Sequence, residues 1–304
     1  MNMDNGAYHI PVLLGEAIDA LQIDPNGVYA DVTYGGGGHS AEILKRLTGG
    51  KLLAFDQDPA ARANVAKDPR FVFVPQNFRY LRSSLLLYRV KQIDGLLADL
   101  GVSSHQFDEG TRGFSIRSEA PLDMRMNPNQ GQSAREILNS WPKEELAALF
   151  KEYGEVERAG LLASRIDEER QAGHMETTGD LLRVLHKLAP PRKELKYFAQ
   201  VFQALRIQVN DEMGALKDVL EQAAEVLKPG GRLVVISYHS LEDRLVKNFM
   251  RSGSFSGEVR KDFFGNTLRP FKPLQSKPIS PSEEEITRNP RSRSAKMRIA
   301  IKLP

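Results

Sequence analysis

Residues 28–58 read VYADVTYGGGGHSAEILKRLTGGKLLAFDQD and contain the features that decide the fold. A short apolar run ends at Asp31, four glycines follow at 35–38, and a helical pattern begins near Ser40. A second apolar run ends at Asp56. Glycines let the chain turn sharply and let a ligand approach the backbone, and the free N–H groups at the helix start point at that ligand. This pattern predicts half of a nucleotide-binding site.

The positions of Asp31 and Asp56 limit which class of nucleoside cofactor the loop is expected to bind. Asp56 lies 21 residues after Gly35, close to the gap of about 20 residues at which a carboxylate on the next strand tip meets a ribose hydroxyl. The dinucleotide fingerprint G-x-G-x-x-G fails at its last glycine, where this chain has Ser40. Asp31 would repel a pyrophosphate and favours a cationic ligand, as in enzymes that use S-adenosylmethionine (SAM). The alternatives are an NAD-dependent oxidoreductase and a glycine-rich surface loop without a ligand.

The composition indicates a globular protein without thiol chemistry. Of the 304 residues, 41% are hydrophobic and 27% are charged, which is ordinary for a domain with a large core. There is no apolar run of about 18 residues and no charged-then-apolar leader, so we expect no membrane span, no signal peptide and a cytoplasmic location. The lack of cysteine excludes disulfides, thiolate metal sites and the methyltransferases that attack a pyrimidine carbon through a cysteine. The six histidines show no metal-ligand spacing, so we expect no metal.

Alternating strand and helix patterns predict an α/β fold with a parallel sheet. After the strands that end at Asp31 and Asp56, short apolar runs occur at 71–75 and 94–100, and a buried run occurs at 232–238. Ligands of such sheets bind beyond the carboxyl ends of the strands. The residues predicted to meet at that edge are Asp31, Asp56, Asn77, Phe78 and Asp99.

The middle of the chain has a different character. Residues 105–132 are rich in Gly, Arg, Asp and Pro, and a loop of that length is typical of functional or disordered segments. From Ser133 onward only helical patterns occur, with capping boxes expected at Ser133 and Thr177. We therefore predict one sheet domain, residues 1–105 and 206–304, interrupted by an inserted helical domain at residues 106–205.

The last third of the chain returns to the sheet. An amphipathic helix is predicted to include Leu227 and to end at Pro229-Gly230-Gly231, and residues 252–281 are predicted to form a mobile loop. Residues 288–302 carry no acid and six cations, which are Arg288, Arg291, Arg293, Lys296, Arg298 and Lys302. Within them, apolar residues alternate from Met297 as in a half-buried strand. The tract is either a phosphate-binding edge or a solvated strand flank.

Seven short motifs connect these features to a known family. In chain order they are YGGGGHS at 34–40, DLGVSS at 99–104, RGFS at 112–115, PLDMRM at 121–126, FQALRI at 202–207, SYHSLEDR at 237–244 and NPRSRS at 289–294. Together they closely resemble the bacterial small-subunit ribosomal RNA cytosine-N4 methyltransferases, the MraW or RsmH family. The resemblance spans nearly the whole chain.

The resemblance implies a class I SAM-dependent methyltransferase sheet with an inserted all-helical domain. The implied activity is methylation of the exocyclic N4 amine of a cytidine in the decoding region of 16S ribosomal RNA, with the helical domain recognising the RNA. The implied partner is small-subunit rRNA within the assembled subunit, and a homodimer is one assembly state that the sequence leaves open. Motif positions assign the cofactor contacts to Gly37, Gly38, His39, Asp56, Phe78, Asp99 and Gln106. Tyr34, Gly36 and His105 stand where some relatives have Phe, Arg and Pro.

Methylation of the cytosine amine needs a hydrogen-bond acceptor, because the lone pair of that nitrogen is delocalised into the ring. We predict that Asp99 or a nearby carbonyl supplies the acceptor, which makes Asp99 the catalytic candidate. Ser103 and His239 are predicted to line the base pocket, and Arg291 and Arg293 to bind phosphates. A non-enzymatic ribosome-assembly factor and a methyltransferase of a protein or a small amine are the further alternatives.

Overall fold

A computed structural model describes residues 11–103, 106 and 110–304, and the chain divides into two compact units. The sheet unit comprises the chain up to Gly101 together with Gly214–Pro304, and the helical unit comprises Val102–Met213. The predicted insertion at 106–205 lies inside the helical unit, whose limits fall a few residues further out on each side. Within the described ranges, no helix is both long and apolar enough to cross a membrane.

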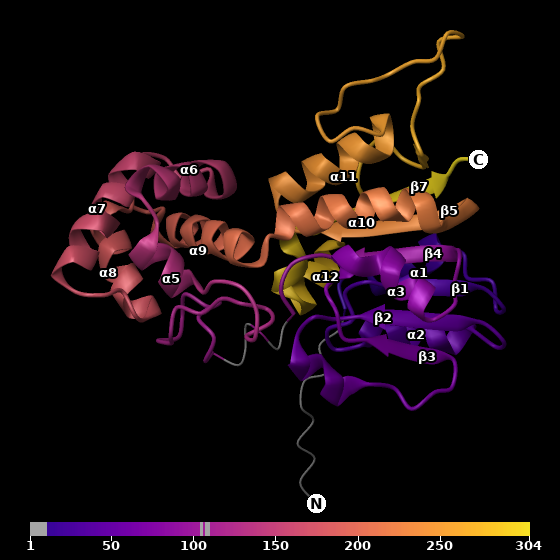
Figure 1. The fold of residues 1–304 in the computed structure, drawn as a ribbon, viewed down its shortest axis with the longest axis horizontal. Helices are drawn as coiled ribbons and strands as arrows, with labels where there is room; N and C mark the ends of the chain where they lie inside the picture. The colour runs from indigo at the N-terminus through magenta and orange to yellow at the C-terminus, as the bar shows by residue number, and fades with distance from the viewer. Residues whose placement is uncertain (1–10, 104–105, 107–109) are drawn as a thin grey trace, which may run out of the picture. The chain divides into compact units, whose positions relative to one another are not determined.

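The sheet unit is built on a sheet that, in the described residues, has seven strands in the order β3-β2-β1-β4-β5-β7-β6 (Figure 1). The strands are β1 (Val28–Asp31), β2 (Lys51–Phe55), β3 (Phe71–Val74), β4 (Ile93–Asp99), β5 (Leu227–Ser237), β6 (Phe271–Pro273) and β7 (Lys296–Lys302). Strands β1 to β5 pair in parallel, whereas β7 runs antiparallel to both β5 and β6. The direction of the strand order reverses between β1 and β4, which is where ligands of open α/β sheets bind.

Helices cover both faces of this sheet. They are α1 (Leu14–Leu21), α2 (Gly38–Arg46), α3 (Leu81–Leu87), α10 (Glu212–Val226), α11 (Ser240–Ser252) and α12 (Glu283–Arg288), with short 3₁₀ turns η1 (Pro59–Asn64), η2 (Phe78–Tyr80) and η3 (Pro290–Ser294). The apolar core on one face includes side chains of α3, α10 and α11, and the core on the other face includes side chains of α1 and α2.

Period-2 alternation along the strands divides their side chains between the two cores. In β2, Leu53 and Phe55 belong to the core of α3, α10 and α11, whereas Leu52 and Ala54 belong to the core of α1 and α2. All four are fully buried. Parallel strands covered on both faces are therefore continuously apolar, and only their ends are open for polar groups.

The beginning of β5 differs from the prediction. Leu227 pairs with Ile93 of β4 instead of ending a helix, and the pairing resumes at Gly95 and Arg232. The register shift leaves Lys228–Gly231 as an irregularity in the strand, which is where proline and glycine are tolerated in a sheet. The predicted helix stop is thus a bulge.

The prediction of a loop at 252–281 is wrong for three residues within it. Residues Phe271–Pro273 form β6, which pairs with β7, and Phe271 is fully buried in the core of the sheet unit. A strand of three residues is too short to produce a detectable hydrophobic period. The predicted strand after Ala295 is confirmed as β7.

The helical unit contains α5 (Ala134–Ser140), α6 (Lys143–Gly154), α7 (Ala159–Ala172), α8 (Thr178–Leu188) and α9 (Glu194–Asn210) (Figure 1). Both expected capping boxes are present, at Ser133 for α5 and at Thr177 for α8. The described part of the loop before α5 packs on the same core, because Phe114, Leu122 and Met124 are buried with the helices. This loop is therefore part of the folded helical unit.

Candidate functional site

The glycine loop between β1 and α2 is confined on one side and open on the other. Gly37 has a φ of +79° and a Cβ there would lie 2.8 Å from the hydroxyl oxygen of Tyr34, while a Cβ on Gly38 would lie 2.1 Å from Cγ of Pro11. In contrast, a Cβ on Gly36 would meet nothing within 4 Å. Only glycine fits at the two confined positions, and the backbone at Gly36 faces open space.

Tyr34 cannot move away easily to make room for a side chain in the loop. Its ring is 4% exposed and packs against the rings of Phe71 and Phe73, with centroids 5.4 and 5.6 Å away. Its hydroxyl donates a hydrogen bond to the carbonyl of Asn64. The loop thus rests on a rigid aromatic support.

Asp56, directly after β2, holds the loop from the other direction. Its Oδ2 accepts a hydrogen bond from the N–H of Gly35 at 2.8 Å, and its Oδ1 accepts one from the N–H of Asp58 at 2.8 Å. A carboxylate has about four acceptor positions, so about two remain for a ligand. Burial raises the pKa of Asp56 to about 6, against the stabilising effect of the two N–H donors. Above that pH the group is an anionic acceptor.

Asp31, at the end of β1, makes its contacts within the protein. It is 1% exposed, and its Oδ2 accepts a hydrogen bond from the Ser40 hydroxyl at 2.7 Å while its Oδ1 accepts one from the N–H of Thr33 at 3.1 Å. Burial raises the pKa of Asp31. The side chain that was predicted to face a cationic ligand therefore also fixes the first turn of α2.

Asp99 ends β4, next to β1 in the sheet. Its Oδ1 accepts a hydrogen bond from the Tyr238 hydroxyl at 2.7 Å, and its Oδ2 lies 3.8 Å from Nδ1 of His39. Burial raises the pKa of Asp99 to about 6, yet 21% of the side chain remains exposed. Burial also raises the pKa of Tyr238, so this hydroxyl stays protonated and acts as a donor. Asp99 is an oriented carboxylate with access to solvent.

His39 and Phe78 complete the predicted cofactor contacts of the sheet unit. His39 lies in the first turn of α2, is 6% exposed, and its Nε2 donates to the carbonyl of Val12 at 3.2 Å. Phe78 begins η2 after β3, where it is half-buried and packs against the core beneath α3 and α10. Asn77 caps this turn by accepting from the N–H of Arg79. Part of the Phe78 ring is thus free to contact a ligand.

The charges at the strand tips fit SAM better than a dinucleotide. Asp31, Asp56 and Asp99 lie at the carboxyl ends of three adjacent parallel strands. Among the described residues, no lysine or arginine forms an ion pair with any of them. Excess negative charge at one sheet edge attracts a sulfonium and an ammonium group and repels a pyrophosphate. The open backbone at Gly36 and the remaining acceptors of Asp56 also fit a nucleoside.

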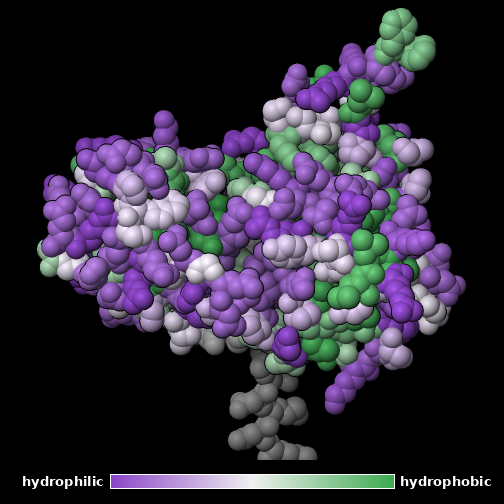
Figure 2. Space-filling view, in the orientation of Figure 1, coloured by the Kyte–Doolittle hydropathy of each residue, from purple (hydrophilic) through white to green (hydrophobic). Residues whose placement is uncertain are grey.

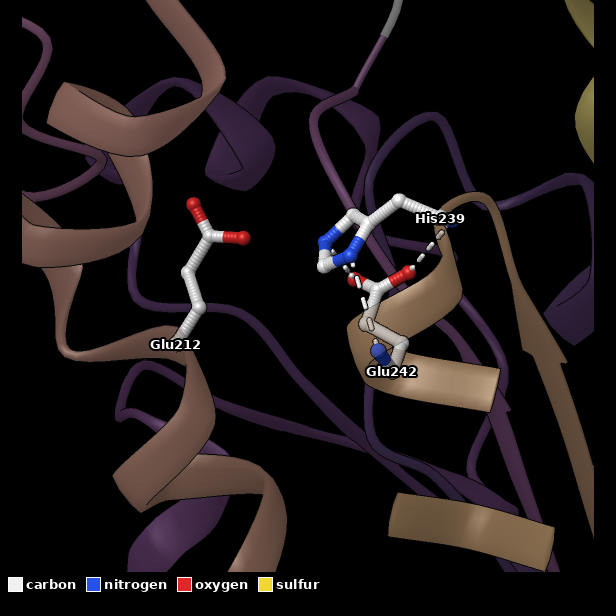
Figure 3. A group of neighbouring side chains, drawn as sticks. All are labelled: Glu212, His239 and Glu242. Atoms are coloured by element: carbon white, nitrogen blue, oxygen red, sulfur yellow. Dashed lines mark hydrogen bonds and ion pairs between the residues drawn. The ribbon is translucent and has the colours of Figure 1, made fainter. Parts of the chain in front are cut away.

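The motif at 237–244 runs from the last residue of β5 into the first turns of α11 (Figure 3). Nδ1 of His239 accepts from the N–H of Glu242 at 3.5 Å, and Oε2 of Glu242 accepts from the N–H groups of Tyr238 and His239 at 2.8 and 3.3 Å. His239 Nε2 is buried 3.2 Å from Glu242 Oε1 in an orientation that makes no hydrogen bond. His239 therefore caps a helix, and Tyr238 is the member of the motif that contacts Asp99. Glu212, also drawn in Figure 3, belongs to the helical unit and pairs with Arg206 at 2.7 Å.

Two predicted site residues, Ser103 and Gln106, lie in the helical unit. The Gln106 Oε1 accepts from the N–H of Ser103 at 3.0 Å, and the Ser103 hydroxyl accepts from the N–H of Gln106 at 3.3 Å. The Gln106 side chain is buried. The structure brings these two residues together, while His105 and the last serine of their motif lie outside the described residues.

The basic tract at 288–302 is less cationic than its sequence suggests. Arg298 donates to both carboxylate oxygens of Asp243 on α11, at 2.7 and 3.2 Å, and Lys296 lies 3.8 Å from the same carboxylate. The neutralising acid is distant in the chain, so the count of charges along the tract could not reveal it. Arg291 and Arg293 are exposed on η3. Their exposure is compatible with the predicted phosphate contacts.

Comparison with known proteins identifies the family. The chain matches the model of the MraW methylase family over residues 6–303. It is 54% identical to a ribosomal RNA small subunit methyltransferase H of Parabacteroides distasonis over 305 residues, which cover both chains completely. It is 55% identical to the protein of that name from Cytophaga hutchinsonii over 296 residues, 96% of this chain and 99% of the other. A Bacteroides fragilis protein of the same name is 54% identical over 303 residues, 99% of this chain and all of the other.

These matches decide between the interpretations left open by the glycine loop. The chain has the class I SAM-dependent methyltransferase sheet with an inserted helical unit, so the predicted fold class is confirmed. It is an enzyme whose cofactor is SAM, in agreement with the carboxylates gathered at the strand tips. Because the family model covers nearly every residue and full-length relatives share more than half of them, the chain belongs to the MraW methylase family.

Proposed function

We propose that this enzyme methylates the exocyclic N4 amine of a cytidine in the decoding region of 16S ribosomal RNA, within the assembled small subunit in the cytoplasm. Full-length relatives that are more than half identical are named as methyltransferases of small-subunit rRNA, which supports the substrate class. The observation that carries the proposal is the pair of carboxylates at Asp56 and Asp99, which lie at strand tips on either side of the glycine loop and form no ion pair with a lysine or arginine among the described residues.

The proposed cofactor contacts have distinct physical roles. Asp56 accepts hydrogen bonds from the ribose hydroxyls with the acceptor positions that Gly35 and Asp58 leave unused. Phe78 packs on the adenine ring with the exposed part of its side chain. The N–H groups and open backbone of the glycine loop, from Gly36 to His39, accommodate the rest of the molecule. The loss of any of these contacts is expected to weaken SAM binding.

Bound SAM supplies an electrophilic methyl group on a sulfonium that is a good leaving group. The protein then has to hold the amine in line with that methyl, and correct positioning alone is worth up to about 7–11 kcal/mol of the barrier. Asp99, ionised above a pKa of about 6 and oriented by Tyr238, accepts a hydrogen bond from the amine. This contact favours a tetrahedral nitrogen and frees its lone pair. A backbone carbonyl near the β4 tip is the alternative acceptor.

A single-turnover experiment separates the catalytic role of Asp99 from its role in binding. Because a hydrogen bond to a charged group contributes about 1.5–3 kcal/mol, Asp99→Asn is expected to slow methyl transfer by about 10-fold to 100-fold at saturating SAM. Tyr238→Phe keeps the carboxylate and removes only its orienting hydroxyl, so a smaller reduction in rate is expected. A normal rate for Asp99→Asn at saturating SAM would leave Asp99 as a binding residue only.

The target cytidine has to leave its helix to reach the cofactor. Splaying out a base costs a few kcal/mol, which contacts to the RNA must offset. We assign these contacts to the helical unit, including Ser103 and the loop before α5, to the start of α11 near His239, and to the phosphate contacts of Arg291 and Arg293. Because phosphate contacts release counterions, substrate binding should depend strongly on salt.

Transfer of tritium from labelled SAM to purified small subunits tests the function directly. The expected product, after digestion of the rRNA to nucleosides, is radioactive N4-methylcytidine at one site. Naked 16S rRNA in a parallel reaction tests whether the assembled subunit is required. Label in another nucleoside or in protein would replace the proposed acceptor, and absence of transfer would favour an assembly factor without activity on this RNA.

A further inference from the structure

The segment between α11 and β6 contains a hairpin that projects from the sheet unit (Figure 1). We call residues 259–268 the aromatic hairpin. Its two sides are joined by a bridge between Lys261 and Thr267 and by a hydrogen bond of 2.8 Å from the N–H of Leu268 to the carbonyl of Arg260. Phe263 and Phe264 at its tip are 98% and 83% exposed. Figure 2 shows hydrophobic side chains at the far end of this projection.

The tip is a hydrogen-bonded turn that leaves the rings of Phe263 and Phe264 exposed. The Oδ1 of Asp262 accepts from the N–H groups of Phe264 and Asn266, at 2.9 and 2.8 Å, and its Oδ2 accepts from the Asn266 amide at 3.0 Å. These donors lower the pKa of Asp262. Gly265 has a φ of +86°, a conformation that favours glycine. The hydrogen bonds fix the turn, so little ordering would be needed when the rings bind a partner.

The base of the projecting segment is anchored in the core. The Phe255 ring stacks on Phe249 of α11 with a centroid distance of 4.8 Å, and Phe249 also contacts the fully buried Phe271 at 6.2 Å. Phe255 of this segment thus packs in the core, whereas the two phenylalanines at the tip do not. Exposed large aromatic side chains on a fixed projection indicate an interaction site.

Cations flank the two exposed rings. Arg260 and Lys261 precede the turn and are exposed, and Arg269 follows the hairpin. The charge of Asp262 is engaged by the turn itself. Exposed aromatic rings beside basic side chains are the combination by which proteins bind single-stranded nucleic acid, with bases stacking on the rings and phosphates contacting the cations.

We propose that the aromatic hairpin is a second RNA-binding element, in which Phe263 and Phe264 stack on unpaired bases of small-subunit rRNA while Arg260 and Lys261 contact the neighbouring phosphates. This inference rests on the proposed function for the identity of the RNA. The hairpin would tether the enzyme to its substrate outside the site of methyl transfer. An anionic membrane and an apolar pocket on a protein are the competing partners, and the small apolar area of two rings on a basic stem suits RNA better than a membrane.

Binding of purified small subunits, measured by sedimentation, tests the hairpin separately from methyl transfer. Stacking of one base changes affinity by about 5-fold to 150-fold, so Phe263→Ala/Phe264→Ala should weaken binding at least about 10-fold. SAM affinity and thermal stability should stay unchanged, because both side chains are solvent-exposed. Phe263→Trp/Phe264→Trp should retain binding, since tryptophan also stacks. The matched control is Leu86→Ala/Leu87→Ala on α3, where the side chains are 59% and 74% exposed.

Leucine at both positions distinguishes stacking from general apolar contact. Phe263→Leu/Phe264→Leu should bind subunits as weakly as the alanine variant if bases stack on the rings. Wild-type binding by either the alanine or the leucine variant would overturn the inference. Loss of sedimentation with phosphatidylserine vesicles in the alanine variant, without loss of subunit binding, would assign the hairpin to membranes instead. Failure of wild-type enzyme to methylate the rRNA that it binds would overturn the proposed function while leaving the hairpin result standing.

Discussion

Asp56 and Asp99 both have pKa values raised to about 6 by burial, well above the ordinary value of 3.8. Because these groups release protons less readily in the folded protein, they favour folding below the ordinary pKa, and this contribution is lost as the pH rises through about 6. Binding of SAM at the proposed site is expected to have the opposite dependence, since the ribose hydroxyls and the cationic groups of the cofactor would need ionised carboxylates. Ionisation of the two residues at neutral pH therefore lowers the stability of the empty protein and is expected to raise its affinity for SAM.

The affinity for SAM is accordingly expected to be constant above about pH 7 and to fall below pH 6. Two carboxyl groups must each lose a proton before SAM binds, so well below pH 6 the affinity for SAM should fall by about 100-fold for each pH unit. Calorimetric titrations between pH 5 and pH 8 measure this. Asp99→Asn should reduce the limiting loss to about 10-fold, and Tyr238→Phe should move the midpoint upward because the tyrosine donor lowers the pKa of Asp99. An affinity that is independent of pH across this range would contradict the assignment.

Strands, loops and caps differ in how well the sequence predicts them. The ends of β1, β2 and β4 were predictable within about one residue because each apolar run stops at an acidic residue. β6 was not, because Phe271–Pro273 is defined by pairing with β7 and not by a local pattern. The link between Tyr238 and Asp99 was also hidden, since it joins residues far apart in sequence. Where a local sequence pattern is too short to define the structure, tertiary contacts determine it.

The glycine loop gives a prediction with a matched control inside it. Gly37→Ala places a Cβ against the rigid ring of Tyr34 and requires a left-handed conformation, which costs an alanine about 1–2 kcal/mol. We expect a loss of stability of at least that size in urea unfolding, together with weaker SAM binding. Gly36→Ala, whose Cβ would meet open space, should retain the stability of the wild type. Equal stability of the two variants would show that the loop conformation is not the one described.

At the scale of the whole molecule, the order of sheet and helical segments was readable from the sequence, but the distribution of charge was not. Six cations between 288 and 302 indicated a basic edge, and the fold brings Asp243 against the strand part of that tract. Charge counts along a chain do not include the acids that folding brings from elsewhere. Arg291 and Arg293, which are exposed on η3, remain the proposed phosphate contacts.

This distribution predicts the salt dependence of the reaction. Arg291→Gln/Arg293→Gln should raise the KM for small subunits and reduce the slope of log KM against log salt by about 1–2, since each phosphate contact contributes about 0.7–0.9. Lys45→Gln/Arg46→Gln removes the same charge from α2, where both cations pair with Glu42, and serves as the control. A slope that is the same in both variants would remove Arg291 and Arg293 from the RNA interface.

The central claim is that the tips of β1, β2 and β4 form the SAM site, and calorimetric titration of SAM into wild-type protein and Asp56→Asn tests it most directly. We predict one SAM per wild-type chain, affinity lower by about 10-fold or more in Asp56→Asn because charged hydrogen bonds to the ribose are lost, and no binding of NADH. Asp68→Asn, which removes a carboxylate paired with Arg70, should bind SAM normally. Equal SAM affinity in wild type and Asp56→Asn, or no heat with SAM at all, would contradict the account.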